Sequence, residues 1–513
     1  THTTPQSLTQ MVRSSASMLI GHNLIGFDLP KLKEVWDVDL YNIDIRDTYV
    51  MSRLLNPNRE GGHSLKAWGT QVGEYKGEFT DYDNFCQEMI DYCIQDCRVN
   101  RLVYRRLVER LKHDGFSEQS IELEHRVALI TKQQELNGFQ LDEDLATSWM
   151  NEMYYRNKEI TEQLQEEFPP IVTQRWSEKT GKRLKDHVEV FNIGSRQQIA
   201  KRLTSIGAKF KDKTEKGNII VNETTLGKID LPEAALCAEY LTNVKLLGMV
   251  TSWLEAADLE GRVHGRVNTI GAVTRRMTHS GPNMGQIPSL PIARECWTVA
   301  GGNSLVGADA SGLELRCLAH YMQDDNYTDL ILNGDIHTYN QELAGLPTRR
   351  DAKVFIYALL YGAGDAKLGS IVGASRSHGK AMRERFMKGL PAYRELVTRV
   401  ERASKGGTLP CLDGGRVHVR HEHAALNTLL QSCGAVVMKQ AVVNLFDITQ
   451  RNRIPFKLVA QVHDEFQLEV STHLATALGM SAVLAIEEAG EMLNTRCPMT
   501  GEYHVGNNWS QTH

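Results

Sequence analysis

Two aspartates of this chain are placed where carboxylates could share divalent cations. Asp309 follows the apolar run 304–308, which predicts a short strand. Asp464 interrupts the alternating segment 456–470, which predicts a hairpin with a three-residue tip. Glu465 is a weaker candidate ligand, because solvation alone explains a third acid at a hairpin tip. An aspartate taken alone is more often a turn residue or a helix cap than a metal ligand. Together the two aspartates could hold two cations roughly 3.5–4 Å apart, an arrangement that activates a hydroxyl and stabilises a leaving phosphate oxygen.

A second pattern combines cations and aromatic rings on one predicted helix. Residues 349–361 contain no Pro or Gly and precede Gly362, which predicts a helix that ends there. The side chains that recur every four residues on one face are Arg349, Lys353, Tyr357 and Tyr361. Cations can hold a triphosphate, and rings offer flat surfaces to a sugar and bases. The alternative is an ordinary helix with a solvated face and tyrosines in the core. This alternative accounts for each of the four residues taken singly, but less well for all four on one face.

These segments and their flanks resemble family A DNA polymerases. The R-x3-K-x3-Y-x3-YG pattern resembles the fingers helix of that family, and residues 309–316 and 462–465 resemble two palm motifs. Residues 309–320, 333–338 and 423–432 are most similar to the replicative polymerases of short-tailed lytic bacteriophages (podoviruses). The resemblance implies a multidomain α+β fold. A right-hand polymerase, with an antiparallel-sheet palm and helical fingers and thumb, would follow an incomplete α/β RNase H-like exonuclease domain.

The length of 513 residues favours several domains. The resemblance implies a partial 3′-5′ exonuclease-like domain at 1–115 and a polymerase domain at 116–513. Within the latter the implied parts are the thumb at about 142–250, the palm at about 251–324 and 405–513, and the fingers at about 325–404. Sequence signals predict helices at 122–134 and 142–167, a capping box at 195–198, and mainly helices from 325 to 404.

The resemblance also implies roles for residues at the polymerase site. Asp309, the backbone carbonyl of Ala310, and Asp464 would bind two Mg²⁺ ions, which suit hard oxygen ligands. Lys353 would also be catalytic, donating a proton to pyrophosphate. The implied nucleotide-binding residues are Arg349, Lys353, Tyr357, His337 and Glu314. Among these, Glu314 would exclude a ribose 2′-hydroxyl and accept a hydrogen bond from Tyr357.

Further residues are expected to grip the primer and the template. The implied set is Tyr361, Gly362, Arg276, Asn427, Gln431 and His463. Asn427 and Gln431 lie four residues apart, so one helical face could present both amides to the minor groove, although two surface amides are an alternative. Relatives commonly carry glycine where Arg275 stands, so we expect a different local turn there.

The N-terminal part resembles a proofreading exonuclease, with Asp28 in the second motif and Tyr92 and Asp96 in the third. The first motif, Asp-x-Glu, is missing, because residues 1–21 contain no Asp or Glu. We therefore expect an N-terminally clipped chain or a vestigial exonuclease, while residues 506–509 resemble the natural C-terminus of the family. Slow proofreading is the expected consequence.

The implied partners are a primed DNA template, dNTPs and phage replisome proteins, in the host bacterial cytoplasm. A thioredoxin clamp is not expected, because only a short basic segment at 169–191 replaces the thumb insertion that recruits it. No membrane association is expected. Two alternatives stay open at this point: a single-subunit phage-type RNA polymerase, against which Glu314 and the exonuclease-like part argue, and a non-catalytic DNA-binding module, which would not need paired carboxylates.

Overall fold

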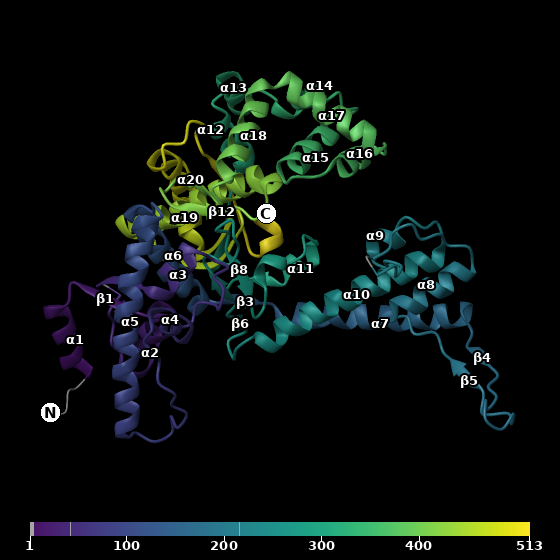
Figure 1. Ribbon diagram of the computed structural model, residues 1–513, viewed down its shortest axis with the longest axis horizontal. Coiled ribbons are helices and arrows are strands. Elements are labelled where there is room, and N and C mark those ends of the chain that lie inside the picture. The colour runs from purple at the N-terminus through teal and green to yellow at the C-terminus, as the bar shows by residue number, and fades with distance from the viewer. Residues whose placement is uncertain (1–4, 42, 215) are drawn as a thin grey trace. The chain divides into compact units, whose positions relative to one another are not determined.

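The computed structural model describes residues 5–41, 43–214 and 216–513 (Figure 1). Contacts divide the chain into two compact units. The main unit comprises the described residues up to 139 together with 264–287 and 299–513. The second unit comprises the described part of 140–263 together with 288–298.

A four-stranded antiparallel sheet forms the centre of the main unit. Its strand order is β13 (Lys457–Val462), β14 (Glu465–Ser471), β10 (Asn303–Ala310) and β15 (Gly501–Gly506). Helix α20 (Ala475–Met492) packs against β10 and β15, while α6 (Glu118–Asn137) packs against β13. All of β14 except its last residue is buried, because strands flank it on both sides and helices cover the sheet. This sheet with its helices is the scaffold on which the candidate site stands.

Helix α19 (Ala425–Asn452) is the longest helix in the core of the main unit and packs against α20 and α6. Residues Glu422–Asn452 are long and apolar enough to cross a membrane by length and composition. However, 89% of that apolar window is buried inside the protein, which is the behaviour of a core helix.

The segment from residue 325 to 404 is helical, as predicted. It consists of α13 (Asp325–Asn333), α14 (Ile336–Ala344), α15 (Arg349–Leu360), α16 (Asp365–Ile371), α17 (Arg376–Gly389) and α18 (Pro391–Ser404), which follow α12 (Leu313–Met322). Figure 1 shows α14 to α17 grouped together. Helix α15 begins where the Thr348 hydroxyl accepts a hydrogen bond from the Asp351 amide at 3.1 Å. It ends before Gly362, whose φ of +76° is a conformation that favours glycine.

The N-terminal part of the main unit is α/β. Its elements are α1 (Pro5–Ser15), β1 (Met18–Gly21), η1 (Leu24–Asp28), α2 (Leu29–Trp36), β2 (Asp44–Asp47), α3 (Thr48–Leu55), α4 (Leu65–Val72) and α5 (Gln87–His113). Strands β1 and β2 pair in parallel and are the whole sheet of this part, as far as its described residues go. The N-terminal part therefore combines a small parallel sheet with helices.

Short hairpins and turns complete the main unit. They are β7 (Arg266–Asn268) with β8 (Thr278–Ser280), β11 (Thr408–Pro410) with β12 (Arg416–His418), and the single turns η2 (Met284–Gln286), η3 (Glu422–Ala424), η4 (Thr472–Leu474) and η5 (Trp509–Gln511).

The second unit is built on two long helices, α7 (Glu143–Glu167) and α10 (Pro232–Ala256), which pack against each other. Its other elements are β3 (Phe139–Leu141), β4 (Ile171–Thr173), β5 (His187–Glu189), α8 (Arg196–Ser205), α9 (Glu223–Leu226), β6 (Arg262–Val263), α11 (Pro291–Glu295) and β9 (Trp297–Thr298). The predicted capping box at the start of α8 is only half formed. Ser195 accepts from the Gln198 amide, but the Gln198 side chain accepts from the Asn192 amide at 2.7 Å, because the chain before the cap folds back over it.

Candidate active site

Strand pairing brings the two aspartates to the same end of the central sheet. Asp309 pairs with Glu465 in the β10–β14 register, and the Ala310 amide donates to the Asp464 carbonyl at 3.0 Å. Asp309 lies inside β10, one residue before its last residue, whereas the sequence predicts a strand that ends at Asp309. The hairpin turn is also shorter than predicted. Because Val462 pairs with Glu465, only His463 and Asp464 form the tip, and His463 takes a φ of +58°.

The charges around Asp309 are mainly acidic. Burial, followed by the negative charges of Asp464 and Glu465, raises the pKa of Asp309 to about 7. The pKa of Asp464 is also raised, chiefly by burial and then by Glu314. Partly buried carboxylates whose pKa is raised by burial and by neighbouring acids are suited to binding divalent cations, whose charge would offset the repulsion. The oxygen-only donor set formed by Asp309, the Ala310 carbonyl and Asp464 fits a hard cation such as Mg²⁺.

Glu465 is buried, which corrects the prediction that it is solvated at the hairpin tip. It is 5% exposed. The Trp509 indole donates to its Oε1 at 2.6 Å, His513 Nδ1 lies 2.7 Å from its Oε2, and the Gln467 side-chain amide also donates to Oε1. Since both carboxylate oxygens have partners, Glu465 anchors the C-terminal residues beside the aspartates.

The predicted cationic and aromatic face of α15 is joined by His337 from α14. The His337 and Tyr357 rings lie 6.5 Å apart. Burial lowers the pKa of His337, and the positive charges of Arg349 and Lys353 lower it further, so these three side chains are electrostatic neighbours. Arg349 is exposed and forms an ion pair with Asp335 at 2.7 Å. The structure therefore gathers Arg349, Lys353, Tyr357 and His337 in one place.

Glu314 contacts a different tyrosine from the one predicted. The hydroxyl of Tyr361, not that of Tyr357, donates to Glu314 Oε1 at 2.8 Å. Tyr361 occupies the C-cap of α15, beyond the last helical residue, where its ring reaches the first turn of α12. Tyr357 still lies near Glu314, since burial and then that carboxylate raise the pKa of Tyr357 to about 12.

The residues expected to grip DNA lie on several elements of the main unit. Asn427 and Gln431 share one face of α19, where the Gln431 amide donates to Asn427 Oδ1 at 2.9 Å. Arg276 approaches Glu314, with 3.5 Å between Nη2 and Oε1, and lines a small cavity together with His463.

The preceding Arg275 has a φ of +63°. Arg275 thus adopts a backbone conformation that glycine favours. An arginine in place of glycine is therefore compatible with the same turn, and the different turn that was expected is not needed.

Three residues predicted for exonuclease chemistry line one cavity of about 1600 Å³ in the N-terminal part. Asp28 ends η1, whereas Tyr92 and Asp96 lie on α5. Sequence reasoning missed Lys76, whose Nζ lies 2.8 Å from Asp96 Oδ2 and 5.0 Å from the centre of the Tyr92 ring. No local motif marks Lys76, because only folding brings its loop against α5. This lysine forms an ion pair with one of the carboxylates predicted for exonuclease chemistry.

Comparisons with known proteins identify the family and the fold. Residues 158–511 match the family profile of DNA polymerase family A. The DNA-directed DNA polymerase of Enterobacteria phage T3 is 32% identical, over 97% of this chain and 92% of that protein. The DNA-directed DNA polymerase of Escherichia phage T7 is likewise 32% identical with the same coverage. A solved structure of the POL domain of Pol1 from M. smegmatis shares the fold, with a TM-score of 0.78 at 20% identity, covering 93% of this chain and 84% of that one.

The chain belongs to DNA polymerase family A. It is a DNA-directed DNA polymerase, and its reaction is template-directed DNA synthesis on a primed template with dNTPs. The fold is the right-hand polymerase expected from the sequence. Polymerases of this family are metal-dependent enzymes. The alternatives of an RNA polymerase and of a non-catalytic module are not favoured by these matches.

Proposed function

We propose that Asp309, the backbone carbonyl of Ala310, and Asp464 hold two Mg²⁺ ions and that the primer 3′-hydroxyl reacts beside them. The observation that carries this proposal is the hydrogen bond between Ala310 and Asp464, which fixes two carboxylates of raised pKa at one end of the sheet. Bound there, the ions would lower the pKa of the hydroxyl and neutralise the departing pyrophosphate.

The face of α15 supplies the other side of the reaction. Arg349 and His337 hold the outer phosphates of the incoming dNTP, because they stand together at the start of α14 and α15. Lys353, one turn further along, is exposed and neutralises phosphate charge, then donates its proton to pyrophosphate. Tyr357 and Tyr361 offer their rings to the sugar and to the neighbouring template base.

Primer extension tests this function directly. A primed single strand, all four dNTPs and Mg²⁺ should give extension to the template end, and chelation of the metal should stop it. Extension that proceeds undiminished in excess chelator would refute the metal assignment. Failure to extend any primer with Mg²⁺ or Mn²⁺ would refute the whole proposal.

The Glu314→Ala enzyme should incorporate ribonucleotides more readily than the wild type. The Glu314 carboxylate, held by Tyr361 and Arg276, would crowd a 2′-hydroxyl beside the sugar. Its removal should lower the ratio of kcat/KM for dNTP over rNTP by about ten- to a hundredfold. Single-nucleotide incorporation with matched dNTP and rNTP measures this ratio, and an unchanged ratio would contradict the role of Glu314.

The N-terminal part should remove mispaired primer ends slowly. Asp28 and Asp96 share the cavity with Asp47, Glu78 and Glu135. Lysines already pair with Asp96, Glu78 and Glu135, which leaves a poor carboxylate set for two metals. We expect Mg²⁺-dependent digestion of a mispaired 3′ end to be much slower than extension of a paired one. Brisk digestion that Asp96→Ala abolishes would show this expectation to be wrong.

The proposed setting is phage DNA replication in the cytoplasm of a bacterial host, with other replisome proteins as partners. The similarity to the phage T3 and T7 polymerases over nearly the whole chain supports it. Between α7 and α8 the chain has only the β4–β5 hairpin and its flanks, which supports a polymerase that does not recruit thioredoxin.

A further inference from the structure

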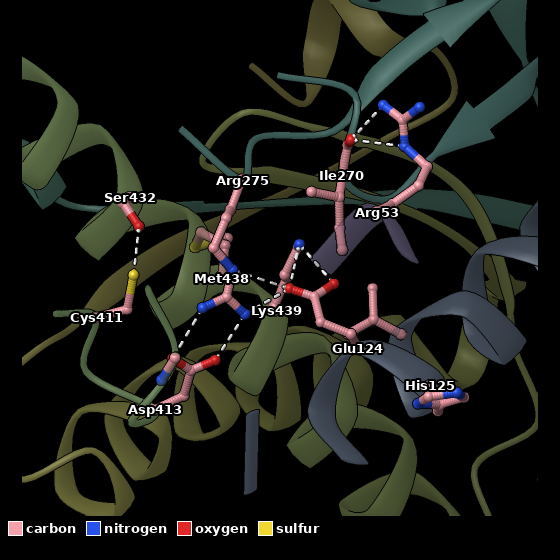
Figure 2. A network of polar contacts seen from close by, with 12 residues as sticks. Arg53, Glu124, His125, Ile270, Arg275, Cys411, Asp413, Ser432, Met438 and Lys439 are labelled. Carbon is pink, nitrogen blue, oxygen red and sulfur yellow. Dashed lines mark hydrogen bonds and ion pairs between the residues drawn. The ribbon is translucent and has the colours of Figure 1, made fainter. Parts of the chain in front are cut away.

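Four charged side chains meet in the interior of the main unit (Figure 2). Arg275 donates to both oxygens of Asp413, at 2.9 and 2.7 Å, and to Glu124 Oε1 at 2.6 and 3.2 Å. Lys439 donates to both oxygens of Glu124, at 2.7 and 2.8 Å. Each of the four side chains is at most 1% exposed. Two positive and two negative charges balance, so the cluster is electrically neutral as a whole.

Arg275 is the residue that joins the parts of this network. Asp413 lies in the turn between β11 and β12, and Glu124 lies on α6. Burial alone would raise the pKa of Asp413, but the Arg275 guanidinium lowers it, so the aspartate stays ionised. A planar guanidinium can serve two carboxylates at once, which a lysine ammonium cannot do with the same geometry.

The next residue along the chain reaches the proposed sugar-selecting site. The turn is closed by hydrogen bonds from the Arg275 amide to the Ala272 carbonyl at 3.0 Å and from the Ala272 amide to the Arg276 carbonyl at 3.1 Å. Arg276 then extends to Glu314 Oε1, which Tyr361 also contacts. With the Arg275 side chain locked and its backbone held at positive φ, the direction of Arg276 is constrained.

We propose that Arg275 is a positioning residue that holds Arg276 against Glu314 and thereby sharpens selection of the deoxyribose sugar. The proposal rests on the function proposed above for Glu314. A cluster that served stability alone would act equally on every substrate, because it touches none of them. A positioning role predicts instead that loss of Arg275 changes the preference between dNTP and rNTP.

The test uses the double variant Arg275→Gly/Asp413→Asn. Glycine keeps the positive φ, asparagine avoids an unpaired buried charge, and the pair of Glu124 and Lys439 stays intact. We expect the ratio of kcat/KM for dNTP over rNTP to fall by about three- to tenfold. We expect this lower ratio to result mainly from a higher KM for dNTP.

Two controls make the result specific. Arg53→Ala removes a different arginine tether on the same segment, where Arg53 donates to the Ile270 carbonyl at 2.6 and 3.0 Å (Figure 2). Its sugar preference should match the wild type, and an equal loss there would overturn the inference. Glu314→Ala reports on the proposed function itself. If Glu314→Ala leaves the ratio unchanged, the proposed role of Glu314 fails.

If Glu314→Ala lowers the ratio while the Arg275→Gly/Asp413→Asn enzyme keeps the wild-type ratio, the positioning role fails on its own. If the double variant does not fold, Arg275→Lys is tested instead, because lysine keeps the positive charge but lacks the planar guanidinium that contacts two carboxylates. It should show the same loss of discrimination. A folded Arg275→Lys enzyme with wild-type discrimination, or failure of both variants to fold, would assign the cluster to stability and overturn the proposal.

Discussion

Asp464→Asn should lower the single-turnover rate of dNTP incorporation by about a thousandfold, with little change in affinity for primed DNA. The substitution keeps the size of the side chain and removes the charge that would hold a metal against the departing phosphate, an effect of several kcal/mol on the barrier. Asp309→Asn should behave similarly, because Asp309 is the other carboxylate of the pair. Rapid quenched incorporation measures the rate, and fluorescence anisotropy measures the affinity.

Asp447→Asn is the matched control for these variants. Asp447 lies on α19, is 44% exposed and forms an ion pair with Arg126. Surface pairs of this kind contribute about 0–1 kcal/mol to stability, so its incorporation rate should stay close to wild type. Wild-type rates in Asp464→Asn would rule out the two-metal assignment, whereas an equal loss in Asp447→Asn would show that the assay reports general damage.

Lys439→Met should destabilise the folded protein by about 3–5 kcal/mol. The substitution leaves Glu124 and Asp413 with Arg275 as their shared cation, so one buried negative charge loses its compensation. Urea unfolding followed by circular dichroism should show a lower midpoint. Glu124→Gln/Lys439→Met should lose less stability than the two single variants added together, because it removes both members of a pair.

Lys457→Met provides the comparison for Lys439. Lys457 is exposed at the start of β13, so its substitution should change stability by no more than about 0.5 kcal/mol. Equal unfolding midpoints for Lys439→Met and the wild type would show that the buried lysine is uncharged or replaceable.

Local patterns predicted the elements that carry the site. The four-residue spacing from Arg349 to Tyr361 depends only on helical geometry, and α15 begins at Arg349 as predicted but ends at Leu360, with Tyr361 at its C-cap. The helix predicted at 142–167 and the mainly helical stretch 325–404 also form, with Asp142 as the N-cap of α7 instead of its first residue. These features are determined within one or two turns of chain.

Contacts between segments that are distant in the sequence could not be predicted from such local patterns. Glu465 was expected in solvent because a turn residue usually is, but pairing with β10 and the return of Trp509 bury it. The partner of Glu314 was misassigned for the same reason, because a choice between Tyr357 and Tyr361 depends on how α12 meets the end of α15.

One signal in the sequence could have revealed the buried network. Lys439 is the one charged residue in the mainly apolar stretch 435–443, and a charge inside a buried helix requires a partner. The identity of that partner could not be read, because Glu124 is contributed by another helix far away in the chain. The ion pair between Lys76 and Asp96 could not be predicted either, because Lys76 lies in a loop and Asp96 lies on α5.

The most direct test of the central claim is to count the metal ions at Asp309 and Asp464. Mn²⁺ prefers the same oxygen ligands as Mg²⁺ and can be observed by electron paramagnetic resonance. A complex with a dideoxy-terminated primer, template and the next dNTP holds the site before reaction. We predict two coupled Mn²⁺ ions per chain, roughly 3.5–4 Å apart, and loss of the coupled pair in Asp464→Asn. A single uncoupled ion in the wild-type complex, or an unchanged pair in Asp464→Asn, would contradict the account.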